Sequence, residues 1–167
     1  LERALKLKPA HAVALYDSGN ILARLGDWSA AETQYRAALV SRPNYTRALN
    51  NLGLVLMQQK NYGEAATNLQ AALRLDPDFP DAHNNYATLC FHEGRHEDAA
   101  RSFARAMELA PDNLDYAINA GDALVRIGRN DSAANCYRHA LELQPDNEKT
   151  RAKLAALTSS PIIPGTK

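Results

Sequence analysis

The sequence predicts an all-α fold, a right-handed α-α superhelix (solenoid) built from antiparallel pairs of helices. Apolar residues recur at three- and four-residue intervals along most of the chain, which is the period of an α-helix. A fixed 34-residue period is the signature of a solenoid, in which each repeat packs only against its neighbours. That period is marked by five prolines, which are Pro9, Pro43, Pro77, Pro111 and Pro145.

The period divides the chain into complete repeats and shorter flanking segments. Each complete repeat is expected to hold a first helix, a short turn and a second helix that ends before the proline. We expect residues 1–11 to be the second helix of an incomplete repeat, and residues 148–159 to be a capping helix whose charged residues, including Lys153, face water. Residues 160–167 contain two prolines and are expected to form a flexible tail. The complete repeats cover residues 12–45, 46–79, 80–113 and 114–147.

The turn inside each repeat has its own signal. Glycine occupies it at Gly26, Gly94 and Gly128, where a positive φ is expected after a helix. Lys60 takes this place in the second repeat, so we expect either strain or a different turn there. The residue after each later proline is expected to cap the next first helix. These residues are Asn44, Asp78, Asp112 and Asp146.

Small and bulky residues also recur in register. Counted from the start of each repeat, the eighth position is small and the twenty-fourth is bulky. Two helices approach closely only where side chains are small, so we expect close approach at the small residues and expect the bulky residues to fill the space between neighbours. The small residues are Gly19, Gly53, Ala87 and Gly121, and the bulky residues are Tyr35, Leu69, Phe103 and Tyr137.

This pattern resembles the tetratricopeptide repeat, which reads W-x2-L-G-x2-Y…A-x3-F…P over 34 residues. The small, bulky, alanine and proline positions match in all four repeats. The departures lie in the first helix, where mostly aliphatic residues replace the family's Trp and Tyr. The resemblance implies a non-enzymatic binding module whose first helices line a concave groove. The departing residues are Leu15, Leu49, His83 and Ala117, and then Leu22, Leu56, Cys90 and Leu124.

The sixth position of the first helix carries a polar row, which is Asp17, Asn51, Asn85 and Asn119. The row resembles the asparagine ladder in the repeat regions of the peroxisomal import receptor and of O-linked N-acetylglucosamine transferase. An asparagine amide can donate and accept at once, so a ladder can hold an extended peptide by its backbone. The alternative is that these residues form only a solvated helix surface.

Neighbouring positions are expected to line the same groove. An apolar strip from Leu54 through Met57 to Phe91 suits a peptide with one or two apolar anchors. Binding of a chaperone C-terminal carboxylate is excluded, because Asp81 stands where that clamp needs a basic residue. The predicted peptide-binding residues are Asp17, Asn20, Asn50, Asn51, Leu54, Met57, Asn84, Asn85, Phe91 and Asn119.

One catalytic motif matches by letters. The segment from His92 to His96 spells HExxH, which binds zinc when a continuous helix places both histidines on one face. Gly94 at the turn breaks that spacing. We therefore predict no metal site, no cofactor and no enzymatic activity.

The charge composition excludes some classes of binding partner. The chain has 19 basic and 19 acidic residues, so its balanced charge argues against nucleic acid and against an anionic membrane. We expect a protein or peptide partner. Cys90 and Cys136 lack the CxxC spacing and fit a reducing compartment, so a cytoplasmic location is expected. The chain does not begin with Met, and we expect it to be a piece of a longer protein.

Two alternatives to a peptide-binding scaffold remain open. The chain could be a homotypic oligomerisation scaffold, associating through open half-repeats or through a tail that contains Ile162 and Ile163. It could instead be the substrate-recruiting arm of a larger enzyme. Light scattering at rising concentration would distinguish the first alternative from peptide binding.

Overall fold

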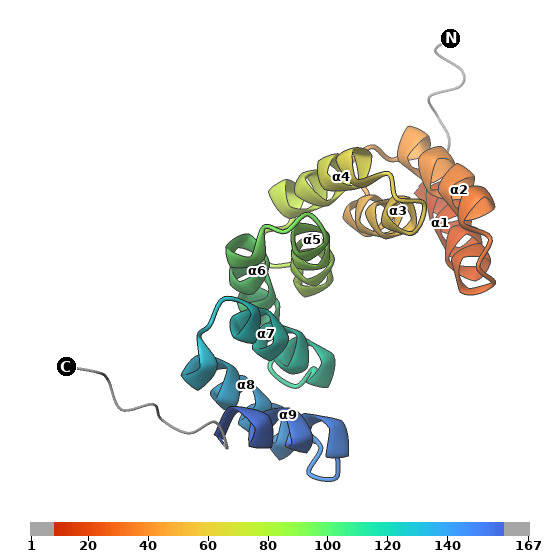
Figure 1. Ribbon diagram of the computed structural model, residues 1–167. Helices are drawn as coiled ribbons and strands as arrows, with labels where there is room; N and C mark the ends of the chain where they lie inside the picture. The colour runs from red at the N-terminus through yellow and green to blue at the C-terminus, as the bar shows by residue number, and fades with distance from the viewer. Residues whose placement is uncertain (1–8, 159–167) are drawn as a thin grey trace.

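The computed structural model describes residues 9–158, and within this range the chain forms nine α-helices and no strand (Figure 1). None of the described helices is both long and apolar enough to cross a membrane. Their bounds are α1 (Pro9–Arg24), α2 (Trp28–Ser41), α3 (Thr46–Gln58), α4 (Tyr62–Leu75), α5 (Pro80–His92), α6 (His96–Leu109), α7 (Leu114–Arg126), α8 (Asn130–Leu143) and α9 (Glu148–Thr158).

The helices pair in chain order and form a right-handed superhelix, as the sequence predicts. Each helix packs mainly against the helices before and after it, and α3 also contacts both α1 and α5. In Figure 1 the pairs follow an open arc, with α3, α5 and α7 on its inner side and α4, α6 and α8 on its outer side. The first helices therefore line the concave face.

The ends differ from the expected boundaries. Helix α1 begins at Pro9 and not after residue 11, which is possible because proline fits the first turn of a helix without losing a hydrogen bond. The expected helix over residues 1–8 and the expected tail lie outside the described residues. The capping helix is present as α9, from Glu148 to Thr158.

The predicted turns are confirmed. Gly26, Gly94 and Gly128 adopt φ values of 80°, 77° and 75°. Lys60 adopts φ 63° at the equivalent place, so the second repeat keeps the same turn and accepts strain. A non-glycine residue in this region costs on the order of 1–2 kcal/mol.

The predicted caps are wrong by one residue. Helices α3 and α7 follow Tyr45 and Asn113, and the Asn113 side chain accepts from the Tyr116 amide at 3.2 Å. The residue after the proline is used in a tight turn instead, closed by the Tyr45 N–H donating to the Arg42 carbonyl at 3.1 Å. Asn44, Asp78, Asp112 and Asp146 all precede the true capping position.

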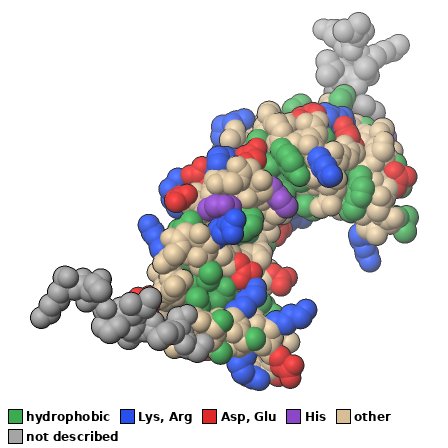
Figure 2. All heavy atoms as spheres, in the orientation of Figure 1, with side chains coloured by type: hydrophobic (Ala, Val, Ile, Leu, Met, Phe, Trp, Pro, Cys, Tyr) green, Lys and Arg blue, Asp and Glu red, His purple; other side chains and the backbone are tan. Residues whose placement is uncertain are grey.

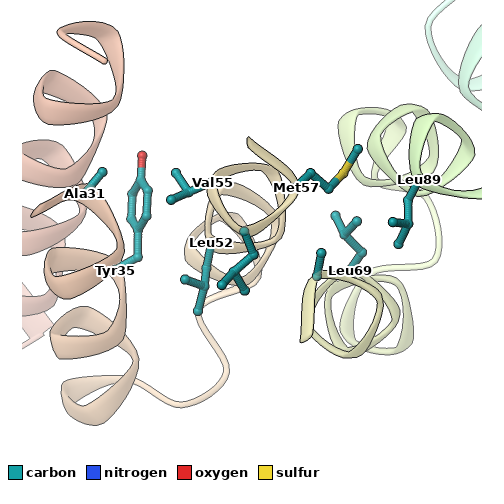
Figure 3. Close-up of a cluster of buried hydrophobic side chains, with 9 residues drawn as sticks. Ala31, Tyr35, Leu52, Val55, Met57, Leu69 and Leu89 are labelled. Atoms are coloured by element: carbon teal, nitrogen blue, oxygen red, sulfur yellow. The ribbon is translucent and has the colours of Figure 1, made fainter. Parts of the chain in front are cut away.

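The core is continuous from one helix pair to the next. Figure 3 shows Tyr35 of α2 beside Val55 and Leu52 of α3, and Leu69 of α4 beside Leu89 of α5. The side chains of Val55 and Leu89 are 1% and 0% exposed. Burying an aliphatic side chain contributes about 1.5–3 kcal/mol, so these contacts between pairs stabilise the superhelix.

The small residues at the eighth position have the predicted packing role. A Cβ atom placed on Gly19 would lie 2.6 Å from the Tyr35 ring, and one on Gly121 would lie 2.5 Å from the Tyr137 ring. In both repeats the ring lies directly on the backbone of the first helix. Gly63, by contrast, has open space around it.

Candidate peptide-binding groove

Side-chain amides on the concave face form one continuous relay. Asn119 Nδ2 donates to Asn84 Oδ1 at 3.0 Å, and Asn84 donates to Asn85 at 3.5 Å. Asn85 then donates to Asn50 Oδ1 at 3.0 Å, and Asn50 donates to Asn51 at 3.0 Å. Each side-chain amide nitrogen donates a hydrogen bond to the next amide oxygen, so the relay runs in one direction from α7 through α5 to α3.

The relay ends on α1 and α2. Asn51 Nδ2 donates to Asn20 Oδ1 at 2.8 Å and to the Tyr16 hydroxyl at 3.3 Å. The Tyr35 hydroxyl donates to the same Asn20 oxygen at 2.8 Å. Burial raises the pKa of Tyr35, so this hydroxyl is held as a neutral donor.

The relay was not predicted from the sequence. The ladder was expected to face a ligand, yet its amides bond the preceding helix. The superhelix places the sixth position of one first helix beside the fifth position of the helix before it. Asparagine occupies both positions in Asn50-Asn51 and Asn84-Asn85. These adjacent asparagines were the feature of the sequence that could have indicated the relay.

The relay leaves some hydrogen-bonding capacity, because a primary amide has two N–H donors and an oxygen with two lone pairs. Asn51 donates both hydrogens, and Asn50 is 3% exposed, so neither has a donor to offer a ligand. Asn85 and Asn119 are half-buried and each donates once within the relay. The available amides are therefore on α5 and α7.

The apolar strip is only partly as predicted. Leu54 and Phe91 are each 37% exposed, but Met57 is 8% exposed and packs in the core beside Leu69 and Leu89. The prediction of Met57 as a groove residue does not fit this burial. Val125 on α7 occupies the same position in its repeat as Phe91 and Met57, and it is 38% exposed. Asp17 is exposed and takes no part in the relay.

Two cavities open beside the relay on the concave side. The larger, about 390 Å³, lies over α1, α2 and α3, and the smaller, about 200 Å³, lies between α5, α6 and α7. Each cavity is lined by aromatic rings and by at least one asparagine side chain that belongs to the relay or accepts its last hydrogen bond. The larger is lined by residues that include Tyr16, Asn20, Trp28, Tyr35, Asn51 and Leu54. The smaller is lined by Thr88, Phe91, Phe103, Asn119, Asp122 and Ala123.

A second polar junction joins α9 to the last complete repeat. The Tyr137 hydroxyl donates to Asp122 Oδ1 at 2.7 Å, and Lys153 Nζ lies 2.6 Å from both carboxylate oxygens. Burial, and then the hydrogen bond to Asp122, raise the pKa of Tyr137 well above its usual value. Lys153 therefore pairs with Asp122, although the sequence placed it among residues that face water.

The HExxH letters lie across a turn, as predicted. His92 ends α5, His96 begins α6, and Gly94 between them has φ 77°. The helical spacing that zinc ligation requires is broken. Within residues 9–158, no three His, Cys, Asp or Glu side chains gather in a way that could hold a metal ion.

Models of the tetratricopeptide repeat match residues 1–46, 16–67, 50–113 and 91–157. The chain belongs to the tetratricopeptide repeat family. Proteins of this family are generally non-catalytic scaffolds for protein–protein interaction. A comparison with curated proteins finds no match.

Solved structures with the same fold include two of MamA and one of YrrB. A crystal structure of MamA protein is 20% identical, with a TM-score of 0.76, over 88% of this chain and 80% of that chain. MamA from Desulfovibrio magneticus RS-1 is 27% identical, with a TM-score of 0.71, over 86% and 79%. YrrB, described as a TPR protein with an unusual peptide-binding site, is 24% identical, with a TM-score of 0.70, over 91% and 78%.

Proposed function

We propose that the concave groove holds a peptide or protein segment, through apolar anchors and the amides that the relay leaves available. The observation that carries the proposal is the pair of concave cavities, each edged by an apolar side chain in solvent. Leu54 lies at one and Phe91 at the other, and each is 37% exposed. Charges of both signs are interspersed over the surface in Figure 2, which suits a mixed peptide better than a polyanion.

The amides would bind the backbone of the ligand, as in the asparagine-ladder type of the family. Asn85 and Asn119 are the candidates, because each keeps one N–H outside the relay. Each such bond contributes about 0.5–1.5 kcal/mol net, so the ladder supports the apolar anchors without replacing them. YrrB, which shares the fold, is described as a TPR protein with an unusual peptide-binding site.

The test begins with random peptides displayed on phage and selected on the intact chain. Phe91→Ser and Leu54→Ser should weaken the best peptide by about tenfold or more, since each removes one anchor. Both side chains are partly exposed, so the melting temperature should change little. Val40→Ser is the matched control, because Val40 on α2 is 72% exposed and lines neither cavity. Equal peptide affinity in all three variants would contradict the proposal that the peptide binds in the groove.

A second candidate is homotypic assembly, with another copy of the chain stacking on α1. Ile21 and Leu25 are 59% and 76% exposed, whereas Val55 on α3, equivalent to Ile21, is 1% exposed against the preceding pair. The stacking face of α1 is therefore uncovered within the described residues. Light scattering should then show a larger mass at rising concentration, and Ile21→Ser with Leu25→Ser should abolish the increase. A constant monomer mass would reject this candidate.

A further inference from the structure

The smaller of the two cavities beside the relay, between α5, α6 and α7, is suited to a single side chain. Its volume is about 200 Å³, whereas pockets for separate small molecules usually measure about 300–1,000 Å³. Its apolar walls include two phenylalanine rings, Phe91 at 37% exposed and Phe103 at 6% exposed. None of the basic residues in the described range 9–158 lines this cavity.

The polar groups of this cavity are mainly hydrogen-bond acceptors. The Thr88 hydroxyl donates its hydrogen to the Asn84 carbonyl at 2.9 Å, so towards a ligand it can only accept. Asn119 Nδ2 donates to Asn84 Oδ1, and no described residue donates to the Asn119 side-chain oxygen. The relay therefore begins with an open acceptor, on a residue that lines this cavity.

Asp122 adds a negative charge to the same cavity. Its carboxylate accepts one hydrogen bond from the Tyr137 hydroxyl and two from Lys153 Nζ, and an ionised carboxylate has about four acceptor sites. Lys153 Nζ lies 5.9 Å from the centre of the Tyr137 ring, so an ammonium already rests here between a carboxylate and an aromatic ring. The cavity offers the same combination to a ligand, with the rings of Phe91 and Phe103 in place of Tyr137.

The larger cavity does not share this preference. Asn20 Oδ1 already accepts from Asn51 and from Tyr35, so the last amide of the row has N–H donors left to offer. Arg24 and Asp81 both line that cavity, which therefore has charges of both signs. The amide row thus has an acceptor end at the smaller cavity and a donor end at the larger one, and a cation is favoured only at the first.

We infer that the smaller cavity is a subsite for one basic side chain, lysine or arginine, of the segment that binds in the groove. The methylene groups of this side chain pack against Phe91 and Phe103, and its charged end donates to Asn119 Oδ1 and to Asp122. The inference rests on the proposed function, because the side chain belongs to the bound segment. It adds a specificity, since an acidic residue at this point of the segment would be repelled by Asp122.

The first test uses small probes and needs no identified partner. The intact, isotopically labelled chain is titrated by NMR with Nα-acetyl-lysine amide and with Nα-acetyl-norleucine amide, which lacks only the ammonium. The lysine probe should shift the Asn119 side-chain amide and the Thr88 backbone amide, and should bind about fivefold more tightly or better than the norleucine probe. The Asn20 amide should not respond. Equal affinity of the two probes, or no shift at Asn119, would overturn the inference.

Two substitutions at the ion pair should change this preference in opposite directions. Asp122→Asn removes the charge that attracts the probe, so the preference for lysine over norleucine should fall to about twofold or less. Lys153→Met removes a competing cation, so the preference should rise by about twofold or more. Both break the same ion pair, and a change in the same direction in both variants would show only a loosening of α9 and would overturn the inference. Leu54→Ser at the larger cavity is the matched control and should leave the preference unchanged.

Peptides selected on the intact chain separate this inference from the proposed function. Replacing the basic residue of a selected peptide with norleucine should weaken its binding by about fivefold or more. Peptides that lose affinity in Leu54→Ser but tolerate norleucine at every basic position would support groove binding and overturn the basic subsite. Peptides whose affinity is unchanged in both Phe91→Ser and Leu54→Ser would contradict the proposed function itself, and the subsite with it.

Discussion

The two ends of the superhelix are joined by the same geometry with different chemistry. At α1–α3, Tyr35 bonds Asn20 at 2.8 Å, and Asn20 accepts from Asn51 at 2.8 Å. At α7–α9, Tyr137 bonds Asp122 at 2.7 Å, and Asp122 pairs with Lys153 at 2.6 Å. The first junction is neutral and the second is charged. The repeat therefore determines where the side chains meet, and the residue types determine how the junction responds to salt and pH.

The two middle repeats lack this triad. Leu69 and Phe103 replace the tyrosines, so no hydroxyl reaches the ninth position. Asn85 and Asn119 then donate to the fifth position of the preceding first helix. From α3 onward, each polar residue at the sixth position of a first helix thus finds a partner on the repeat before it, and the alternative partners produce the relay.

The largest expected effect comes from removing a buried ring. Tyr35→Ala and Tyr137→Ala should each lower the free energy of unfolding by about 3–5 kcal/mol, because each ring is almost fully buried. Urea unfolding followed by circular dichroism measures both. The comparison predicts similar losses at the two ends, and a loss below about 1 kcal/mol at either end would contradict the shared geometry.

Filling the space beneath the rings should have the next largest effect. Gly19→Ala and Gly121→Ala place a Cβ against a tyrosine ring, and overpacking of this kind costs about 1–3 kcal/mol. Gly63→Ala is the control, since nothing surrounds that glycine, and it should be neutral or stabilising. If all three alanines were neutral in thermal unfolding, the rings would not lie directly on the backbone.

Removing only the tyrosine hydroxyl should have a different effect on the free energy of unfolding at the two ends. Tyr35→Phe deletes a bond to a neutral amide, with an expected cost of about 0.5–1.5 kcal/mol. Tyr137→Phe deletes a bond to a carboxylate, with an expected cost of about 1.5–3 kcal/mol. Equal costs in urea unfolding would show that the charge of Asp122 does not strengthen its junction.

Alkaline pH should weaken the fold through the same hydroxyl groups. Burial raises the pKa of Tyr137 and of Tyr35, so the unfolded chain loses these protons at a lower pH than the folded chain. Their contribution is complete below pH about 10 and falls as pH rises further through the raised folded pKa. The free energy of unfolding should decline across that range, and Tyr137→Phe should decline less steeply. A parallel decline would contradict the raised pKa.

The smallest effect should come from the ion pair. Lys153 and Asp122 are 39% and 43% exposed, so Lys153→Met should cost at most about 1 kcal/mol. About 1 M NaCl screens such a pair and should speed amide exchange in α9. Exchange at the Asn51 junction should not respond to salt, because no charge takes part. A response at both ends would erase the distinction between them.

Sequence reasoning found the parts of the fold that repeat within one unit. The proline period, the glycine turns and the close approach of helices at Gly19 and Gly121 all follow from local spacing. The capping residues were predicted one position too early, because the tight turn after each proline occupies one more residue than expected. The prediction of Met57 as a groove residue was wrong, and the relay was missed, for a different reason. Both features depend on the angle between successive repeats. That angle is a property of the superhelix and cannot be read from one repeat.

The amide relay also has a mechanical consequence. Its bonds from Asn119 to Asn84 and from Asn85 to Asn50 cross the inner side of the arc. Stretching the superhelix end to end would separate these helices on that side first. The two bonds should therefore resist the first part of such an extension. The relay is thus expected to stiffen the superhelix against small end-to-end extensions.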